Sequence, residues 1–271
     1  MDNWLTALKA LTAPAVLITV TRTEGSVPRK AGTRMLADAG RQVDTIGGGH
    51  LELKAVETAR AMLAAGTLLH AERFPLGPRL GQCCGGMVWL DFELIAPQAA
   101  RIAELEQEAL AKRSAWPHLM LFGAGHVGTA LVHLLGTLPC RVTWVDTRDA
   151  QFPERAPANV SIENTDTPEA LIAGADAGTS FLVMTHSHAL DQAMCEHILR
   201  RPELGWFGLI GSMTKRVAFE RRLLERGFDQ ARIAAMVCPI GIPGITGKEP
   251  AVIAVAVCAQ LLQLWDLKQH P

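Results

Sequence analysis

Residues 119–128 read Leu119-Met120-Leu121-Phe122-Gly123-Ala124-Gly125-His126-Val127-Gly128, an apolar run that leads into a G-x-G-x-x-G glycine pattern. A helical stretch follows and stops near Gly136, and a second apolar run, 141–145, ends on Asp146. This order of strand, glycine turn, helix, strand and acid is the full context of a dinucleotide-binding fold. Two further predicted strands, each followed by a helix, lie at 181–184 and 206–210. The pattern predicts a Rossmann-like, doubly wound parallel sheet.

The glycines of this fingerprint permit a tight turn and a close backbone approach, so the helix N–H groups that follow could bind a phosphate. The acid after the second strand could accept a hydrogen bond from a ribose hydroxyl. A nucleotide-like ligand is therefore expected, with these contacts: Gly123, Gly125, His126, Gly128 and Asp146. The same glycines could instead serve only to pack the helix against the strand.

The chain has 271 residues, which is enough for two domains of ordinary size. The stretch from Lys112 to Pro117 combines charge, a small residue and a proline, and it is the expected boundary. We predict an N-terminal α/β domain over residues 1–113 and the Rossmann-like domain over residues 117–271. In the first domain, strands are expected at 15–20 and 87–95, and helices from Leu51 to Gly66 and over 98–113.

Hydrophobic residues make up 49% of the chain and charged residues 20%, which is typical of a folded globular protein. The 26 basic and 27 acidic residues are mixed along the chain, so neither nucleic acid nor an anionic membrane is an expected partner. The start of the sequence lacks the basic charge of a signal peptide, and the most apolar run, 251–265, is shorter than the roughly 20 residues of a membrane span. Six cysteines without a disulfide-like spacing suit a reducing compartment. We therefore expect a cytoplasmic protein.

Two glycine-rich segments of the first domain could bind a ligand. Segment 46–52 ends a predicted strand and begins a helix, so its successive backbone amides could form an anion-binding nest. Segment 21–35 gathers three arginines, a lysine and several hydroxyl groups, and arginine suits phosphates and polar rings. Glycine triplets and charged loops also occur as plain turns. The contacts expected from the two segments are Ser26, Arg29, Arg34, Gly47, Gly48, Gly49, His50 and Glu52.

A third segment, 80–87, places Cys83 and Cys84 among glycines directly before a predicted strand. Glycines leave these thiols accessible, whereas the other four cysteines fit the usual buried cysteine better: Cys140, Cys195, Cys238 and Cys258. Adjacent cysteines cannot form a tetrahedral zinc site by themselves, and the sequence offers no C-x-x-C partner. A soft metal or a sulfur-transfer reaction fits Cys83 and Cys84 better, with Gln82 beside them.

Polar loops follow the later strands of the second domain, at the sheet edge where doubly wound folds bind their ligands. The loop 185–191 carries His186, His188 and Asp191 and is similar to the H-x-H loops of metal-dependent hydrolases, although its acid lies one position late. A plain helix-capping role is the favoured interpretation of this loop. The remaining candidate contacts of this domain are Ser212, Lys215 and Arg216, and, in the glycine- and proline-rich loop 238–250, Gly244 and Lys248.

Taken in order, seven motifs resemble the xanthine dehydrogenase accessory protein family of the XdhC/CoxI type. They are T-E-G-S-V-P-R-K-A-G-T-R-M (23–35), I-G-G-G-H-L-E (46–52), Q-C-C-G-G (82–86), F-G-A-G-H-V-G (122–128), T-H-S-H-A-L-D (185–191), G-S-M-T-K-R (211–216) and C-P-I-G-I-P-G-I-T-G-K-E-P (238–250). The resemblance covers nearly the whole chain.

The resemblance implies a carrier of molybdenum cofactor that turns over no substrate. It implies that the chain binds the molybdopterin form, protects it, supports its sulfuration by a cysteine desulfurase, and inserts it into the molybdenum-binding subunit of an apo xanthine dehydrogenase. The family's cysteine before two glycines falls on Cys84, with Cys83 as the extra thiol, and either could approach molybdenum. From residue types we expect the phosphate on Gly47–Gly49 or Gly123–Gly128 and the pterin on Arg29 and Arg34.

Two other classes of protein stay open. An NAD(P)-dependent oxidoreductase would share the glycine fingerprint and Asp146, although the first domain offers no obvious acid–base set for it. A metal-dependent hydrolase would use His186, His188 and Asp191. For any of these functions we expect a homo-oligomer, with a homodimer first, because closed two-fold assemblies are the commonest.

Overall fold

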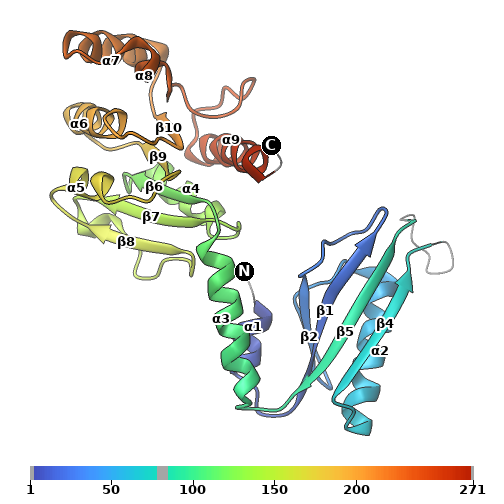
Figure 1. Cartoon of the computed structure of the whole chain (residues 1–271). Coiled ribbons are helices and arrows are strands. Elements are labelled where there is room, and N and C mark those ends of the chain that lie inside the picture. Colours follow the sequence, from blue (N-terminus) through green and yellow to red (C-terminus); the bar gives the residue numbers. More distant parts are fainter. Residues whose placement is uncertain (1–2, 78–84, 270–271) are drawn as a thin grey trace. The chain divides into compact units, whose positions relative to one another are not determined.

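The computed structural model describes residues 3–77 and 85–269, and the chain divides into two compact units, residues 1–112 and 113–271 (Figure 1). Each unit has its own sheet and its own buried side chains. The helix that leads out of the first unit, α3, continues to Ser114, so part of the stretch expected as a linker is helical.

The first unit is built on an antiparallel sheet with the strand order β3-β2-β1-β5-β4. Its strands are β1 (Ala15–Glu24), β2 (Arg34–Ala37), β3 (Gln42–Val43), β4 (Leu69–Pro75) and β5 (Met87–Ile95). Its helices are α1 (Asn3–Lys9), α2 (Gly49–Ala65) and α3 (Ala100–Ser114). The predicted α/β class of this domain is confirmed, and β5 has the bounds expected from the sequence.

Different helices pack on the two faces of this sheet, because successive side chains of a strand point to opposite faces. Side chains such as Ile18 and Phe92 pack against the apolar stripe of α2, whereas Leu17 and its neighbours pack against α1 and α3. Complete burial of each such side chain contributes about 1.5–3 kcal/mol. Gly66 ends α2 in a left-handed conformation with φ 68°, which confirms the predicted stop of the helix.

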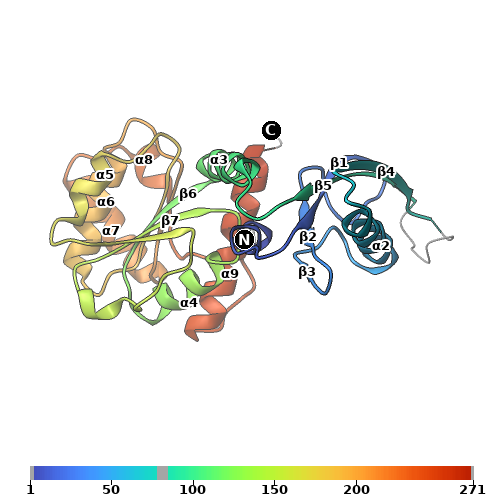
Figure 2. The same ribbon diagram turned by 90° about the horizontal axis from the view of Figure 1, so that it is seen from below.

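The second unit is built on a parallel sheet with the strand order β11-β10-β9-β6-β7-β8. Its strands are β6 (His118–Phe122), β7 (Arg141–Asp146), β8 (Val160–Asn164), β9 (Ser180–Val183), β10 (Trp206–Leu209) and β11 (Met236–Val237). Its helices are α4 (His126–Leu135), α5 (Pro168–Ala173), α6 (His188–Leu199), α7 (Met213–Glu225), α8 (Gln230–Ala234) and α9 (Pro250–Gln269), with a 3-10 turn at Asp149–Gln151. Helices α4 and α9 cover one face and α5 to α8 the other (Figure 2). The predicted Rossmann-like sheet is confirmed.

The winding of this sheet reverses at β6, which pairs with β7 on one side and with β9 on the other. Doubly wound folds bind their ligands at such a switch point, beyond the carboxyl ends of the strands. The loops at this point begin at Gly123 after β6 and at Met184 after β9.

The first unit differs from the sequence prediction in the length of β1. This strand was expected at 15–20 but extends to Glu24, because residues 22–24 pair with the start of β5. Since β2 begins at Arg34, the charged loop between the two strands spans 25–33 rather than 21–35. Among residues 3–77 and 85–269, no helix has the length and apolar character that crossing a membrane requires.

Candidate functional site

Three segments of the first unit meet at one end of its sheet. The antiparallel pairing of Glu24 with Met87 places loop 25–33 beside Gly86, and a Cβ at Gly86 would overlap the Ser26 carbonyl. A Cβ at Gly47 would overlap the ring of Pro28, so the glycine turn before α2 lies against the same loop. We refer to residues 25–33, 44–50 and 85–86 together as the loop cluster. It joins described parts of all three motifs that were singled out in the first domain.

Arg29 and Lys30 are the exposed cations of the loop cluster. Within the described part of the chain, neither side chain makes an ion pair or a hydrogen bond, whereas Arg22 pairs with Glu24 and stacks on Trp89 at 4.7 Å. An unpaired guanidinium and an unpaired ammonium on neighbouring residues can approach an anionic or polar ligand without first breaking an ion pair or a hydrogen bond. Ser26, in the same loop, is also exposed. Arg29 is among the contacts expected from the sequence, whereas Lys30 is not.

The nest predicted at Gly47–Gly49 is filled by a side chain of the protein. The Glu52 carboxylate accepts hydrogen bonds from the backbone N–H groups of Ile46 (3.0 Å) and Gly48 (2.8 Å) and from the hydroxyl of Thr45. Burial raises the pKa of Glu52, but these hydrogen bonds and one from Gln42 outweigh it and hold the pKa below its usual value. These amides therefore already donate to an acceptor within the protein. Glu52 has a structural role, and the expected ligand contact with it is corrected accordingly.

Arg34 does not lie with Arg29, although both were expected to hold the pterin. Met35 is buried under α2, so the alternation along β2 directs Arg34 to the opposite face of the sheet. There its guanidinium donates to Glu108 at 2.6 Å and lies over the Trp4 ring at 5.1 Å. The expected contact with Arg34 is corrected accordingly.

Gln82, Cys83 and Cys84 lie outside the described residues. The described residues on either side of them are joined, because the Leu76 N–H donates to the Gly86 carbonyl at 2.7 Å. Gly86 itself belongs to the loop cluster. The roles expected for the two thiols stay predictions.

In the second unit, two of the three fingerprint glycines are required by packing. Gly123 has φ 122°, and a Cβ on it would overlap the Met184 carbonyl across the switch point. A Cβ on Gly128 would overlap the Gly123 carbonyl, so this glycine lets α4 approach its own loop. Gly125 has open space around it. Gly123 and Gly128 therefore have the packing role that was considered for the fingerprint glycines in the sequence.

Asp146 is engaged and does not offer an oxygen to a ribose. One carboxylate oxygen accepts from the Ala124 N–H (2.6 Å) and the Arg148 Nη2 (2.9 Å), and the other from the Arg148 N–H (3.0 Å) and Nε (2.9 Å). Its side chain is 2% exposed. Burial raises the pKa of Asp146, but the hydrogen bonds from Arg148 and Ala124 outweigh it and lower the pKa overall. We refer to these hydrogen bonds as the Asp146 brace, which the expected ribose contact would have to replace.

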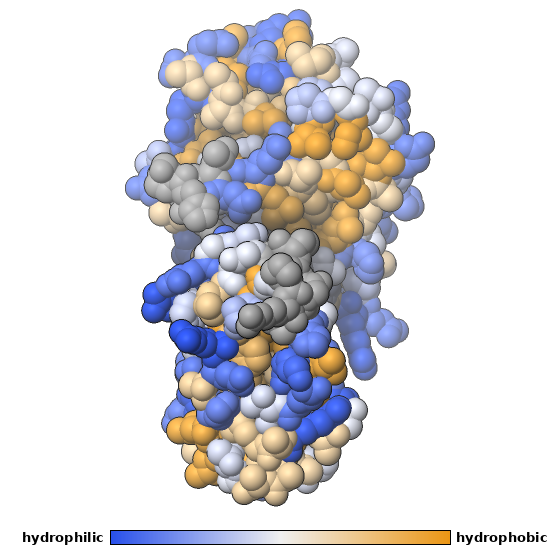
Figure 3. All heavy atoms as spheres, turned by 90° about the vertical axis from the view of Figure 1, so that its right-hand side faces the viewer, coloured by the Kyte–Doolittle hydropathy of each residue, from blue (hydrophilic) through white to orange (hydrophobic). Residues whose placement is uncertain are grey.

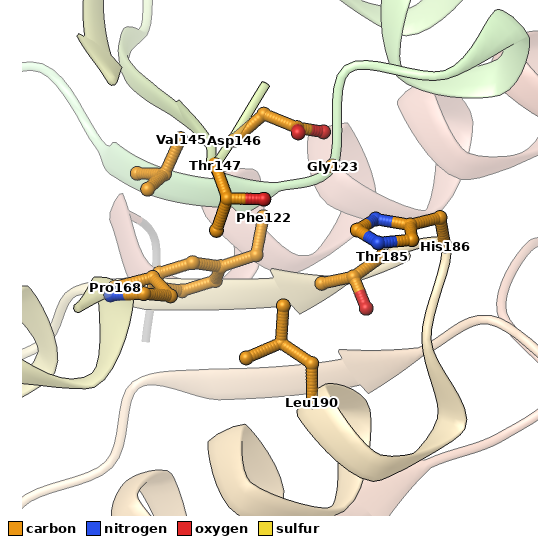
Figure 4. A pocket seen from close by; sticks show the side chains of 9 residues that line it. All are labelled: Phe122, Gly123, Val145, Asp146, Thr147, Pro168, Thr185, His186 and Leu190. Carbon is orange, nitrogen blue, oxygen red and sulfur yellow. The ribbon is translucent and has the colours of Figure 1, made fainter. Parts of the chain in front are cut away.

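A cavity of about 10 Å³ lies at the switch point. Figure 4 shows the carboxylate of Asp146 turned away from Leu190, toward the backbone at Gly123. The other lining residues come from the ends of β6, β7 and β9 and from α5: Phe122, Val145, Thr147, Pro168, Thr185 and His186. A cavity of this size has room for about one water molecule. A nucleotide at this position would require the cavity to widen.

Asp191 of the H-x-H loop after β9 forms hydrogen bonds within that loop. Asp191 is buried and accepts from the Thr185 N–H (3.0 Å) and hydroxyl (2.7 Å), while its second oxygen accepts from Lys215 Nζ at 2.6 Å. Ser187, between His186 and His188, caps α6 by accepting from the Leu190 N–H. The expected ligand roles of Asp191 and Lys215 are corrected to a buried ion pair. Within residues 3–77 and 85–269, no three His, Cys, Asp or Glu side chains gather as the ligands of a metal ion do.

The other ligand contacts expected in the second unit lie at the start of α7 and in the loop before α9. Ser212 caps α7 by accepting from the Lys215 N–H at 3.4 Å. Arg216 pairs with Glu220 at 2.7 Å and donates to the Cys238 carbonyl at 3.0 Å, so it is not open to a phosphate. Gly244 and Lys248 are exposed in the loop before α9.

A groove of about 590 Å³ runs between α4 and α9. It begins at Gly125 and His126, and its rim carries Thr129 and His133. The opposite side includes Val255, which is 52% exposed, and Figure 3 shows apolar side chains at the surface of this unit. Thr129 and His133 were not predicted from the sequence, although their spacing of three and seven residues from His126 places them on one face of a helix.

Two protein-family models match the chain. A model described as the XdhC Rossmann domain matches residues 119–261, and one described as the XdhC and CoxI family matches residues 9–72. The second range contains loop 25–33 and the glycine turn before α2, and the first contains the switch point.

Known proteins are similar along most of the chain. The Uncharacterized protein YqeB of Escherichia coli (strain K12) is 26% identical over 261 residues, which are 95% of this chain and 44% of YqeB. The chain thus spans less than half the length of that relative. A crystal structure described as a xanthine dehydrogenase from Bacillus halodurans has a TM-score of 0.79 and 20% identity, covering 99% of this chain and 96% of that one. At this identity the likeness supports the fold.

Proposed function

The chain belongs to the XdhC and CoxI family, and from that premise we propose that it is an accessory protein in the maturation of a xanthine-dehydrogenase-type molybdenum hydroxylase. Its cargo is the molybdenum cofactor in the molybdopterin form. The protein binds this cargo, protects it during sulfuration by a cysteine desulfurase, and inserts it into the apo enzyme. It is a cytoplasmic carrier and turns over no metabolite.

The observation that carries this proposal is the loop cluster. Molybdopterin offers a phosphate, a pterin with several hydrogen-bonding atoms, and a dithiolene-bound metal, so a carrier needs charged, polar and soft contacts together. Arg29 and Lys30 supply two unpaired cations there, and Ser26 supplies a hydroxyl group. The two adjacent cysteines precede Gly86 by two and three residues in the sequence.

The phosphate of the cargo needs a place other than the nest filled by Glu52. We assign it to the start of α2, beside Arg29. This helix is 17 residues long, and its N-terminus carries the positive end of the helix dipole. Gly49 and His50 form its first turn, and neither is fully buried.

The second unit favours this carrier over an NAD(P)-dependent oxidoreductase. A dinucleotide in the usual position would require Asp146 to exchange its bonds to Ala124 and Arg148 for bonds to a ribose. It would also require the cavity of about 10 Å³ at the switch point to open. No bond has to be broken in this way at the loop cluster, where the exposed Arg29 and Lys30 side chains make no ion pair or hydrogen bond within the described residues.

The test is the molybdenum and pterin content of the purified protein after incubation with released molybdenum cofactor. We expect stoichiometric retention by the wild-type protein, and weaker retention by Cys84→Ala and by the Cys83→Ala, Cys84→Ala double variant. Cys258→Ala is the matched control, because this cysteine is buried in the second unit. Absence of retention by the wild-type protein would overturn the proposal.

A further inference from the structure

The Glu52 carboxylate, just beyond the loop cluster in the chain, accepts several hydrogen bonds from it. One carboxylate oxygen accepts from Thr45, Ile46 and Gly48, and the other accepts from Gln42 Nε2 at 2.9 Å. The residue is 9% exposed. It therefore binds several groups of the turn 45–48, which precedes α2 in the chain.

The turn held by Glu52 touches the loop that carries the free cations. Gly47 has φ 133°, and the Pro28 ring occupies the space where a Cβ at Gly47 would stand. The Arg29 Cγ lies 3.8 Å from the same position. A short series of contacts thus runs from the buried carboxylate through the turn to Pro28 and Arg29.

The backbone of this turn is rich in glycine, so its conformation depends on the contacts around it. Gly47, Gly48 and Gly49 all have positive φ values, of 133°, 80° and 62°. Glycine has the largest conformational freedom of any residue, so three in succession leave many alternative backbones in the absence of other constraints. Without Glu52, the Ile46 and Gly48 amides would also lose their hydrogen bonds to its carboxylate.

We propose that Glu52 is the positioning residue of the loop cluster: its carboxylate fixes the turn 45–48, and the turn fixes where Pro28 and Arg29 lie. The assignment of Arg29 to the cargo rests on the proposed function, but the effect of Glu52 on loop 25–33 does not.

If Glu52 acted on an anionic cargo directly through its negative charge, removal of that charge would strengthen binding, whereas positioning predicts weaker binding when the carboxylate is lost. Two variants distinguish these effects. Glu52→Gln keeps a carbonyl oxygen for Thr45, Ile46 and Gly48, and Gln42 can rotate its amide to accept from the new N–H₂ group. It removes the charge but preserves the geometry. Glu52→Ala removes both the charge and the acceptor.

The first readout is the rate of trypsin cleavage after Arg29 and Lys30 in the native protein, followed by mass spectrometry of the released peptides. We expect Glu52→Ala to be cleaved there about tenfold faster or more, because the turn loses its acceptor. Glu52→Gln should stay within about twofold of wild type, because its acceptor is preserved. Glu108→Ala is the matched control, since Glu108 binds Arg34 and Arg101 on the opposite sheet face.

The second readout is retention of released molybdenum cofactor by the same variants. Retention should fall for Glu52→Ala and be restored in Glu52→Gln. The inference is overturned if Glu52→Ala is folded and cleaved at the wild-type rate, or if Glu108→Ala accelerates cleavage equally. Stronger retention by Glu52→Gln than by wild type would also contradict it, because charge would then dominate. If wild type retains no cofactor but Glu52→Ala is cleaved faster, the carrier proposal fails and the positioning role stands.

Discussion

The carboxylate of Asp146 accepts a 2.6 Å hydrogen bond from the backbone amide of Ala124, so the acid at the end of β7 holds the glycine loop that follows β6. The same carboxylate binds the guanidinium of Arg148 through both oxygens. In a dinucleotide-binding domain, the acid at this position binds a ribose. Here it joins two neighbouring strand ends instead.

This brace predicts weak or absent binding of nicotinamide dinucleotides. In isothermal titration calorimetry, neither NAD⁺ nor NADP⁺ should bind with a dissociation constant below about 1 mM, which corresponds to about −4.1 kcal/mol. The physical reason is that binding would break the bonds of Asp146 without replacing those of Arg148. A dinucleotide-dependent dehydrogenase measured in the same buffer is the positive control. Micromolar binding by this chain would restore the oxidoreductase hypothesis.

The brace also predicts a pH-dependent contribution to stability. The pKa of Asp146 in the folded protein lies below its usual value of 3.8. The carboxylate therefore stabilises the fold above that value, and the contribution is lost as the pH falls through the lowered pKa. Asp146→Asn should be less stable than wild type by about 1–3 kcal/mol at pH 7, and the difference should shrink toward about pH 3. Urea unfolding at the two pH values measures it, and an equal difference at both would contradict the interpretation.

A second prediction on stability concerns the buried pair of Asp191 and Lys215. The Asp191 side chain is 1% exposed and that of Lys215 is 12% exposed. Lys215→Met leaves the carboxylate buried without its cation, so the free energy of unfolding should fall by about 3–5 kcal/mol. Combining it with Asp191→Asn should recover much of this loss, because no uncompensated charge then remains. Strictly additive effects in the double-mutant cycle would show that the pair is not coupled.

Much of the fold follows from the sequence because local signals agree with the packing. The apolar spacing in residues 51–62 and the glycine at position 66 define α2, and the glycine fingerprint identifies the order of β6, α4 and β7. The length of β1 could not be predicted, because residues 22–24 become strand only by pairing with β5. Pairing between distant segments leaves no local pattern.

The candidate site, too, could be predicted from the sequence only in part. The glycines, arginines and acids of the motifs were identified, but not which acceptors are satisfied by the protein itself. Glu52 and Asp146 both lie beside glycine turns, and in each case the turn's own N–H groups bind the carboxylate. Arg34 was grouped with Arg29 by residue type within one segment, although its position next to the buried Met35 on a strand indicates the opposite face.

The central claim, that the loop cluster of the first unit binds the cofactor, is tested most directly by reversing its free charges. The measurement is the molybdenum and pterin content of an Arg29→Glu, Lys30→Glu double variant after incubation with released cofactor. The control is Arg221→Glu, Arg222→Glu, which reverses the same number of charges on the exposed side of α7 in the second unit. We predict that the first variant retains about tenfold less cofactor than wild type, because charge-assisted contacts are lost, and that the control retains the wild-type amount. Equal retention by both variants would contradict the claim.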